Sequence, residues 1–363
     1  MPNHQPPSGD APPFIDAHVH LMGLAGIDML MEVFRQQNLS KMNIVCLADN
    51  VGFGFGFTPM SLLCKALHPR QVYVSGGLRY GPPNNRRRDF ADQARLLRKL
   101  GCDGIKMIEG KPTIRRETGL ALDDPAYDEY YAFLEAQAIP IFFHVGDPPT
   151  FWDPKTIPSF AAAKGWGYWE GGYPTLPQLR AEVDGVLKKF PRLKIIFAHF
   201  YFLSEDLPQA AAFLDRWPGV SFDLTPGSEM YVGFTKQPQA WRDFFIRYQD
   251  RIVFGTDNMA PKGKTVDKMI VRIQHVRKFL ETREIFEGFN STHIQSIALE
   301  KPVLEKIYYR NAERYVGSQP RPLDLNLAGA LALTVIDDAV AAGGDAVQID
   351  ELRETLRQLK DLA

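Results

Sequence analysis

The chain has 363 residues, of which 45% are hydrophobic and 23% are charged, as is typical of a globular protein that folds in water. Its 42 Lys and Arg residues are balanced by 43 Asp and Glu residues, so no excess of basic charge indicates a nucleic acid or an anionic membrane as a partner. No apolar run reaches the length of a membrane span.

The first residues and the cysteines indicate in which cellular compartment the protein is expected. Residues 1–13 are polar and Pro-rich, lack the basic and apolar regions of a secretory signal, and are expected to form a disordered tail. Cys46, Cys64 and Cys102 have no C-x-x-C spacing, and a low, odd number of cysteines favours free thiols. We therefore expect a cytoplasmic protein.

The run FIDAHVH at residues 14–20 predicts a first β-strand. Because alternate side chains share a face of a strand, Asp16, His18 and His20 would point one way and Ile15, Ala17 and Val19 the other. The second group is apolar and suits packing against helices. The first group carries two imidazoles at a spacing that can close on one metal ion.

Short apolar segments and helical segments alternate along the rest of the chain. Further strands are expected at 43–49, 72–79, 104–108, 141–145, 194–199, 220–224 and 251–257. Helices are expected at 27–38, 89–100, 124–137, 176–190, 207–216, 239–248, 266–282 and 302–315. This alternation implies a parallel sheet with helices outside it and predicts a TIM (β/α)8 barrel. An open doubly wound sheet is the alternative, although no G-x-G-x-x-G or P-loop follows an early strand.

The last part of the chain, residues 318–363, differs from the barrel region. Pro320 and Pro322 interrupt it, and Ala- and Leu-rich helical patterns follow at 325–342 and 349–362. We expect a C-terminal two-helix extension that packs either on the barrel or on a second subunit, which leaves a homo-oligomer open.

Polar residues stand near the ends of several predicted strands, where the active site of a TIM barrel lies. They are His18 and His20 on the first strand, His144 on the fifth, His199 on the sixth and Asp257 on the eighth. Alternation groups Phe142 with His144 on the inner face, Ile195 and Phe197 with His199, and Val253 and Gly255 with Asp257.

Any one of these histidines alone could be a hydrogen-bonded core residue. A buried polar group without a partner costs about 1–3 kcal/mol, so several that converge need a common partner. A divalent metal satisfies them together: zinc suits imidazole and carboxylate ligands best, and manganese, iron or nickel remain open. A site of this kind leaves room for a water molecule, whose proton Asp257 could accept.

The chain at this point resembles the amidohydrolase superfamily, specifically the amidohydrolase-2 branch that includes aminocarboxymuconate-semialdehyde decarboxylase-like enzymes. The matching stretches are FIDAHVH (14–20), IFFHVGDP (141–148), LPQLRAEVDGVLKKFPRLKIIFAH (176–199), VSFDL (220–224), IVFGTDN (252–258) and YYRNAERYVG (308–317). The resemblance covers roughly residues 14–317 and implies a distorted TIM barrel. It also implies a metal held by His18, His20, His144 and Asp257. It makes His199 either a catalytic imidazole or a ligand of a second ion.

Relatives with two ions carry a carbamylated lysine or a glutamate that bridges them. Lys106 lies in the predicted fourth strand, with Glu109 just after it. Lys106 would therefore either carry a carbamate, pair with a carboxylate or bind an acidic substrate.

The long segment after the fifth strand is rich in aromatic residues, namely Phe151, Trp152, Trp166, Tyr168, Trp169 and Tyr173. We expect either a lid over an apolar or aromatic substrate, with Trp152 and Trp169 in contact with it, or a small local core. The phenylalanines of a Gly/Phe loop, Phe53, Phe55 and Phe57, could line the same mouth. Arg79, Lys106, Arg115 and Lys262 stand near strand ends and could receive a carboxylate.

These observations predict a metal-dependent hydrolase that acts on an amide, ester or lactone of a small carboxylate-bearing molecule. A second hypothesis is non-oxidative decarboxylation of an aromatic or unsaturated carboxylic acid. A third is a barrel retained only for binding.

Overall fold

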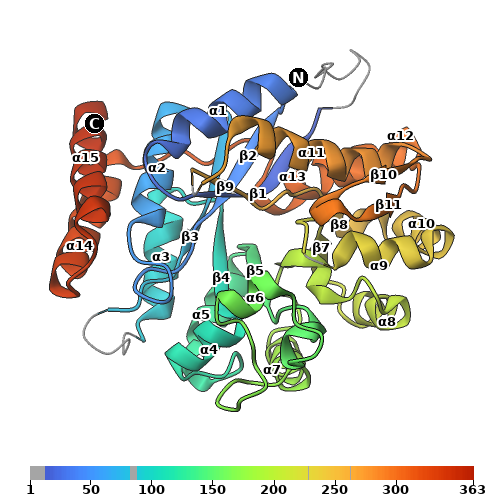
Figure 1. Ribbon diagram of the computed structural model, residues 1–363. Coiled ribbons are helices and arrows are strands. Elements are labelled where there is room, and N and C mark those ends of the chain that lie inside the picture. Colours follow the sequence, from blue (N-terminus) through green and yellow to red (C-terminus); the bar gives the residue numbers. More distant parts are fainter. Residues whose placement is uncertain (1–12, 82–87, 228, 262) are drawn as a thin grey trace.

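The computed structural model describes residues 13–81, 88–227, 229–261 and 263–363 (Figure 1). Most of the predicted tail, and Lys262, lie outside these ranges. The strands are β1 (Ile15–Leu21), β2 (Lys41–Val45), β3 (Val72–Gly77), β4 (Gly104–Gly110), β5 (Ile141–Val145), β6 (Ile195–Phe197), β7 (Val220–Asp223), β8 (Ile252–Val253), β9 (Asn258–Ala260), β10 (Ile285–Glu287) and β11 (His293–Gln295).

The parallel strands form a closed barrel. Their order in the sheet is β8-β7-β6-β5-β4-β3-β2-β1-β9, and β10 and β11 form a separate hairpin. β8 and β9 are two parts of one extended segment, and between them the Phe254 carbonyl accepts a hydrogen bond from the Ala17 N–H at 3.1 Å. The predicted TIM barrel is confirmed, and the interrupted eighth strand is its distortion.

Helices surround the barrel (Figure 1). They are α1 (Gly26–Gln37), α2 (Phe57–Leu67), α3 (Phe90–Leu100), α4 (Pro112–Thr118), α5 (Asp128–Ala136), α6 (Ser159–Ala163), α7 (Leu176–Lys189), α8 (Leu207–Arg216), α9 (Met230–Lys236), α10 (Pro238–Arg247), α11 (Val266–Glu281), α12 (Lys301–Glu305) and α13 (Asn311–Val316). The sequence pattern missed α2. Residues 57–65 of this helix are all buried, so it has no polar face to show a helical period.

The barrel sheet has one apolar cluster on its outer face and another on its inner face. The larger one lies between the sheet and the helices. The smaller one draws on β1, β2, β3, β5, β6 and β8 and is closed by Ala312 and Val316 of α13. Because its residues come from strands all round the ring, this cluster fills the barrel interior.

The first strand departs from the predicted alternation. Ile15 and Ala17 belong to the interior cluster, whereas Val19 packs in the outer one. The reason is a β-bulge: the chain advances three positions on β1, from Asp16 to Val19, while it advances two on β2, from Met42 to Ile44. The prediction that Ile15 and Ala17 face helices was wrong, and the inward direction predicted for His18 and His20 survives because of the extra residue.

The sixth strand also differs from the expectation. Ile196 lies in the interior cluster, and Ile195 and Phe197 pack outside. β6 ends at Phe197, two residues before His199, so strand alternation does not reach that histidine. On β5 and β8, the inward direction of Phe142 and Val253 is confirmed.

The C-terminal extension consists of α14 (Leu325–Ala341) and α15 (Ala346–Leu362). The two helices pack against each other and against α2 on the outside of the barrel (Figure 1). No helix in the described part of the chain is long and apolar enough to cross a membrane.

Candidate metal centre

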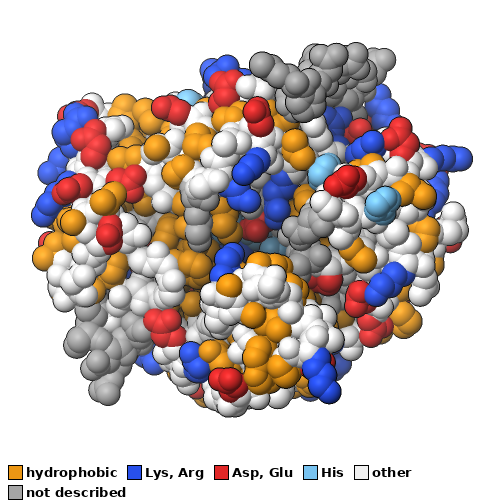
Figure 2. Space-filling model, viewed as in Figure 1, with side chains coloured by type: hydrophobic (Ala, Val, Ile, Leu, Met, Phe, Trp, Pro, Cys, Tyr) orange, Lys and Arg blue, Asp and Glu red, His pale blue; other side chains and the backbone are white. Residues whose placement is uncertain are grey.

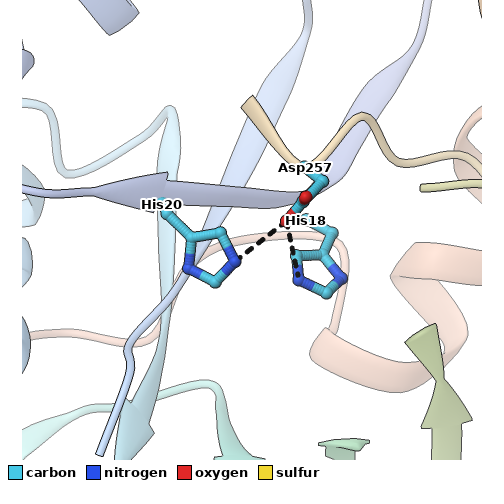
Figure 3. A group of neighbouring side chains, drawn as sticks. All are labelled: His18, His20 and Asp257. Carbon is cyan, nitrogen blue, oxygen red and sulfur yellow. Dashed lines mark ion pairs between the residues drawn. The ribbon is translucent and has the colours of Figure 1, made fainter. Parts of the chain in front are cut away.

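Three of the predicted ligands meet at the barrel end of β1. One ligand atom from each of His18, His20 and Asp257 lies within 4.8 Å of the others (Figure 3). The Asp257 Oδ1 atom is 3.1 Å from His20 Nε2 and 3.9 Å from His18 Nε2. Asp257 adopts a left-handed backbone conformation, with φ of 57°, and its N–H donates to the His18 carbonyl at 2.8 Å. Barrel closure therefore places the carboxylate beside both imidazoles.

The other two histidines lie next to this group rather than within it. The ring centroid of His199 is 5.0 Å from that of His144 and 6.3 Å from that of His18. The His144 Nε2 atom is buried without a hydrogen-bond partner among the described residues, and so is His20 Nδ1. His199 is therefore close both to His144 and to His18 of the three clustered ligands.

Asp223, the last residue of β7, was not singled out from the sequence. Its Oδ2 atom accepts from His18 Nδ1 at 2.7 Å, and its Oδ1 atom accepts from the His199 N–H at 2.9 Å. The carboxylate is fully buried. His144 and Asp257 were predicted because each is a polar residue near the end of an apolar strand. Asp223 in VSFDL has the same position and could have been predicted in the same way.

His199 lies in a turn, not in the strand that was predicted to end with it. Residues 199–202 all have φ between 52° and 55°, a left-handed run that non-Gly residues rarely adopt. The backbone carbonyl of Thr225 accepts from His199 Nδ1 at 3.1 Å. That contact leaves Nε2 as the ring nitrogen that can act on another group.

Asp16 connects the two strands that carry the clustered ligands. It accepts from the Thr256 hydroxyl at 2.6 Å and from the Thr256 N–H at 3.1 Å. Thr256 directly precedes Asp257, and Asp16 is two residues before His18. Asp16 therefore holds the backbone beside His18 and Asp257 in place, and its carboxylate faces Thr256 rather than a metal.

Lys106 reaches the cluster from β4. Its Nζ atom is 3.1 Å from His18 Nε2, and burial lowers its pKa to about 8. Glu109 turns elsewhere: its carboxylate accepts from the Tyr80 hydroxyl at 2.9 Å, and burial raises its pKa. Of the two predicted bridging groups, only Lys106 contacts a candidate ligand.

Burial controls the charge of the imidazoles. It lowers the pKa of His18 well below the ordinary value, lowers that of His144, and brings that of His199 to about 4. Burial acts to raise the pKa of Asp257, but the hydrogen bond with His20 and nearby charges outweigh it and hold the pKa well below the usual range. These shifts favour the neutral form of the His18, His144 and His199 imidazoles beside the ionised carboxylate of Asp257 near neutral pH.

The aromatic segment after β5 forms a small core of its own around Phe151, Ala161 and Tyr168. Trp152 packs against this core and donates from Nε1 to the Pro174 carbonyl at 3.1 Å. Trp169 is 39% exposed. A local core is therefore present, and contact of either tryptophan with a substrate stays a prediction.

A buried carboxylate fastens this segment beside His144. Asp147 accepts from Lys111 Nζ at 2.7 and 2.9 Å and from the Tyr168 hydroxyl at 2.6 Å. Its Oδ1 atom is 3.7 Å from His144 Nε2. The contact between Tyr168 and Asp147 brings the aromatic segment to the edge of the candidate site.

Two of the predicted carboxylate-binding arginines have protein partners. Arg79 Nη1 donates to Asp338 of α14 at 3.1 Å, and Arg115 donates to both oxygens of Glu182. The phenylalanines of the Gly/Phe loop, Phe53, Phe55 and Phe57, pack in the outer core. Of the predicted basic residues in the described part of the chain, Lys106 is the one that contacts a ligand, and Arg272, which was not predicted, lies 3.7 Å from Asp257 Oδ2. Figure 2 shows a hollow at the middle of this face with Lys and Arg side chains at its rim.

The residues present fit a divalent metal. Two imidazoles and one carboxylate cluster within reach of a single ion, and His144 offers a further buried nitrogen that has no hydrogen-bond partner among the described residues. The Asp223 carboxylate on His18 Nδ1 is the outer contact that metal-binding histidines usually make, and it directs Nε2 toward the cluster.

Comparisons with known proteins agree with the barrel and with this chemistry. A family model described as amidohydrolase matches residues 77–317. Among solved structures, an uncharacterised TIM-barrel protein from Bordetella bronchiseptica aligns with a TM-score of 0.54 at 14% identity, over 84% of this chain and 98% of that one. An amidohydrolase from Burkholderia multivorans with bound zinc aligns with a TM-score of 0.50 at 14% identity, over 85% and 100%.

The 5-carboxyvanillate decarboxylase of Sphingomonas paucimobilis aligns with a TM-score of 0.48 at 12% identity, over 84% of this chain and 98% of that one. No curated protein is similar enough in sequence to count as a match.

Proposed function

The chain belongs to the amidohydrolase family, and from this premise we propose that it is a metal-dependent hydrolase of amides, esters or lactones of small carboxylate-bearing molecules. The observation that carries the proposal is the meeting of His18, His20 and Asp257 within 4.8 Å at the end of the barrel. His144 would complete the ligand set, and zinc is the ion that suits these donors best.

A divalent ion at this position would lower the pKa of a water molecule and polarise a carbonyl group. The protein supplies the groups around it. The Asp257 carboxylate, ionised near neutral pH, can accept the proton of the attacking water and pass it to the leaving group.

Hydrogen bonds prepare the two central imidazoles for these roles. A carboxylate and a backbone carbonyl can only accept, so His18 and His199 each donate from Nδ1, to Asp223 and Thr225 respectively. Each therefore keeps an unprotonated Nε2. In His18 this nitrogen would be a metal ligand, and in His199 it could orient the attacking water.

Lys106 gives the site its preference for an acidic substrate. Its Nζ atom is buried beside His18, near the point where a bound molecule would meet the metal. An ammonium group in that place can pair with a carboxylate of the substrate.

The test begins with the purified protein. We expect about one divalent ion per chain and release of an acid from members of a panel of amides, esters and lactones. His18→Ala should lose the ion and the activity together, whereas His293→Ala, an exposed histidine far along the chain, should lose neither. A protein that hydrolyses the panel equally well after removal of its metal would contradict the proposal.

A variant of His199 separates one ion from two. His199→Asn should retain the ion and lose most activity if the imidazole acts on the water. Loss of an ion from this variant would place a second metal at His199.

Lys106 also favours a second candidate, decarboxylation of an aromatic or unsaturated carboxylic acid, because a cation beside the metal can hold the carboxylate that leaves. Release of CO2 in place of a hydrolysis product, measured over a panel of such acids, would select this reaction.

A further inference from the structure

The rim of the site between β1 and β4 is formed by the loops that follow β1, β2 and β3. His20 lies near the end of β1 and Lys106 lies in β4, and the strands run β1-β2-β3-β4 around the barrel. The loops after β2 and β3 therefore lie between β1 and β4 around the rim of the barrel.

The C-terminal helices contact each of these three loops. Glu351 Oε1 accepts from the Leu24 N–H at 2.9 Å in the loop after β1. Gln348 Oε1 accepts from the Phe55 N–H at 3.3 Å in the loop after β2. Asp338 accepts from Arg79, just after β3.

Glycines in the loops let the extension approach this closely. A Cβ atom on Gly23 would lie 2.9 Å from Glu351 Oε1, and one on Gly54 would lie 2.4 Å from Gln348 Oε1. A Cβ atom on Gly56 would lie 2.9 Å from a methyl group of Leu352. The loops and α15 thus fit each other without room for larger residues.

The contact at Leu24 also serves the first helix. The residue at the N-cap of α1 is Ala25, which has no side chain that can cap the free N–H groups. The Glu351 carboxylate lies against the preceding residue, where a negative charge is favoured by the helix dipole. A residue of α15 therefore stabilises the start of the helix that follows the metal-binding strand.

We propose that the C-terminal extension is part of the substrate site, with Asp338, Gln348 and Glu351 as positioning residues that hold the three rim loops that follow β1, β2 and β3. The effect on substrate rests on the proposed function. The effect on the loops does not.

The test uses the full chain with Glu351→Ala, and with Glu354→Ala as the matched control, since Glu354 bonds only to Arg357 and Gln358 on its own helix among the described residues. In Glu351→Ala, hydrogen exchange at residues 22–26 should become about tenfold faster. Metal content should stay unchanged, and KM should rise several-fold more than kcat falls. Unaltered exchange at residues 22–26 would overturn the proposal.

A double-mutant cycle excludes a general loosening of the protein. Gly23→Ala should also accelerate exchange at residues 22–26, because its methyl group would displace Glu351. If both substitutions act through one contact, hydrogen exchange at residues 22–26 in the double variant Gly23→Ala/Glu351→Ala should be no faster than in the faster single variant. If the acceleration of exchange in the double variant equals the product of the two single accelerations, the two residues do not act through a shared contact. Faster exchange with no activity on any substrate would support the loop contact while the proposed function fails.

Discussion

The two halves of the candidate site are built in different ways. His18, His20 and Asp257 lie on β1 and on the segment between β8 and β9, where backbone pairing such as Val19 with Asn258 sets their spacing. His144 lies in β5, where the pairing with β4 shifts its register, and His199 lies in a turn after β6. The buried carboxylates of Asp147 and Asp223 lie beside these two histidines. The first half is thus fixed by main-chain hydrogen bonds, whereas the second half also depends on buried side-chain charge.

This difference predicts which changes unfold the protein and which change only its chemistry. A side chain next to paired strands can be altered without loss of the backbone frame. A buried charge that holds a turn cannot be removed without leaving its partner unpaired in the interior.

The largest effect is expected at Asp147, in the second half. Asp147→Ala leaves the buried Lys111 ammonium without its carboxylate and should lower the free energy of unfolding by about 3–5 kcal/mol. Urea unfolding of the metal-free protein at pH 7 measures this. Asp153→Ala, in the same segment, is the control and should change stability by less than about 1 kcal/mol.

The stability difference between the wild type and Asp147→Ala should depend on pH. Burial acts to raise the pKa of Asp147, but the charge of Lys111 outweighs it and holds the pKa below the ordinary value. Its stabilisation is therefore present above pH ~4 and declines as the pH falls below that value. A gap between wild type and variant that stays constant to pH 2 would contradict this origin.

A smaller effect is expected at Asp223, on the metal-binding half. Asp223→Asn keeps the shape of the side chain but can donate to His18 Nδ1 and so favour the wrong tautomer. Metal affinity should fall about 10–100-fold, as for other outer contacts of metal ligands. Titration with zinc against a competing chelator measures it, and Asp215→Asn on the exposed face of α8 should bind as tightly as wild type.

The backbone at His199 offers the next smaller effect. Asparagine tolerates the left-handed conformation, whereas a β-branched residue is strained there by roughly 1–2 kcal/mol. His199→Val should therefore be less stable than His199→Asn by about that amount. Equal unfolding midpoints for the two variants would show that the turn is not held as described.

The smallest effect concerns protons that compete with the metal. Burial lowers the pKa values of His18, His144 and His199, so protons compete with the metal less at these imidazoles than at ordinary histidines. Affinity for Mn2+ should therefore fall less between pH 7.5 and 6 than it would at a site built from ordinary histidines. Calorimetric titration at both pH values checks this.

The sequence predicted the order of strands and helices well because short apolar segments and amphipathic helices each have a local period. It also brought His18, His20 and Asp257 together, since strand ends of a barrel converge. It did not predict the bulge in β1 or the turn at His199, because both break the alternation on which the side-chain directions were based.

Long-range partners were the other limit. Arg79 was expected to bind a substrate, and its partner Asp338 is 259 positions away in the sequence. Asp223 contacts His18 across 205 positions. No local pattern relates such residues, so their pairing becomes visible only when the barrel closes and the extension docks.

The bulge in β1 has a consequence for how such a barrel can evolve. Ala17 and His18 are neighbours in the chain, yet both point inward, one into the apolar interior and the other into the ligand cluster. One strand thus carries two side-chain registers that are out of step by a residue. Substitutions that change the packing of the barrel interior fall on odd-numbered positions of β1, and substitutions that change the ligand cluster fall on even-numbered ones. Interior packing and site chemistry can therefore change independently during evolution.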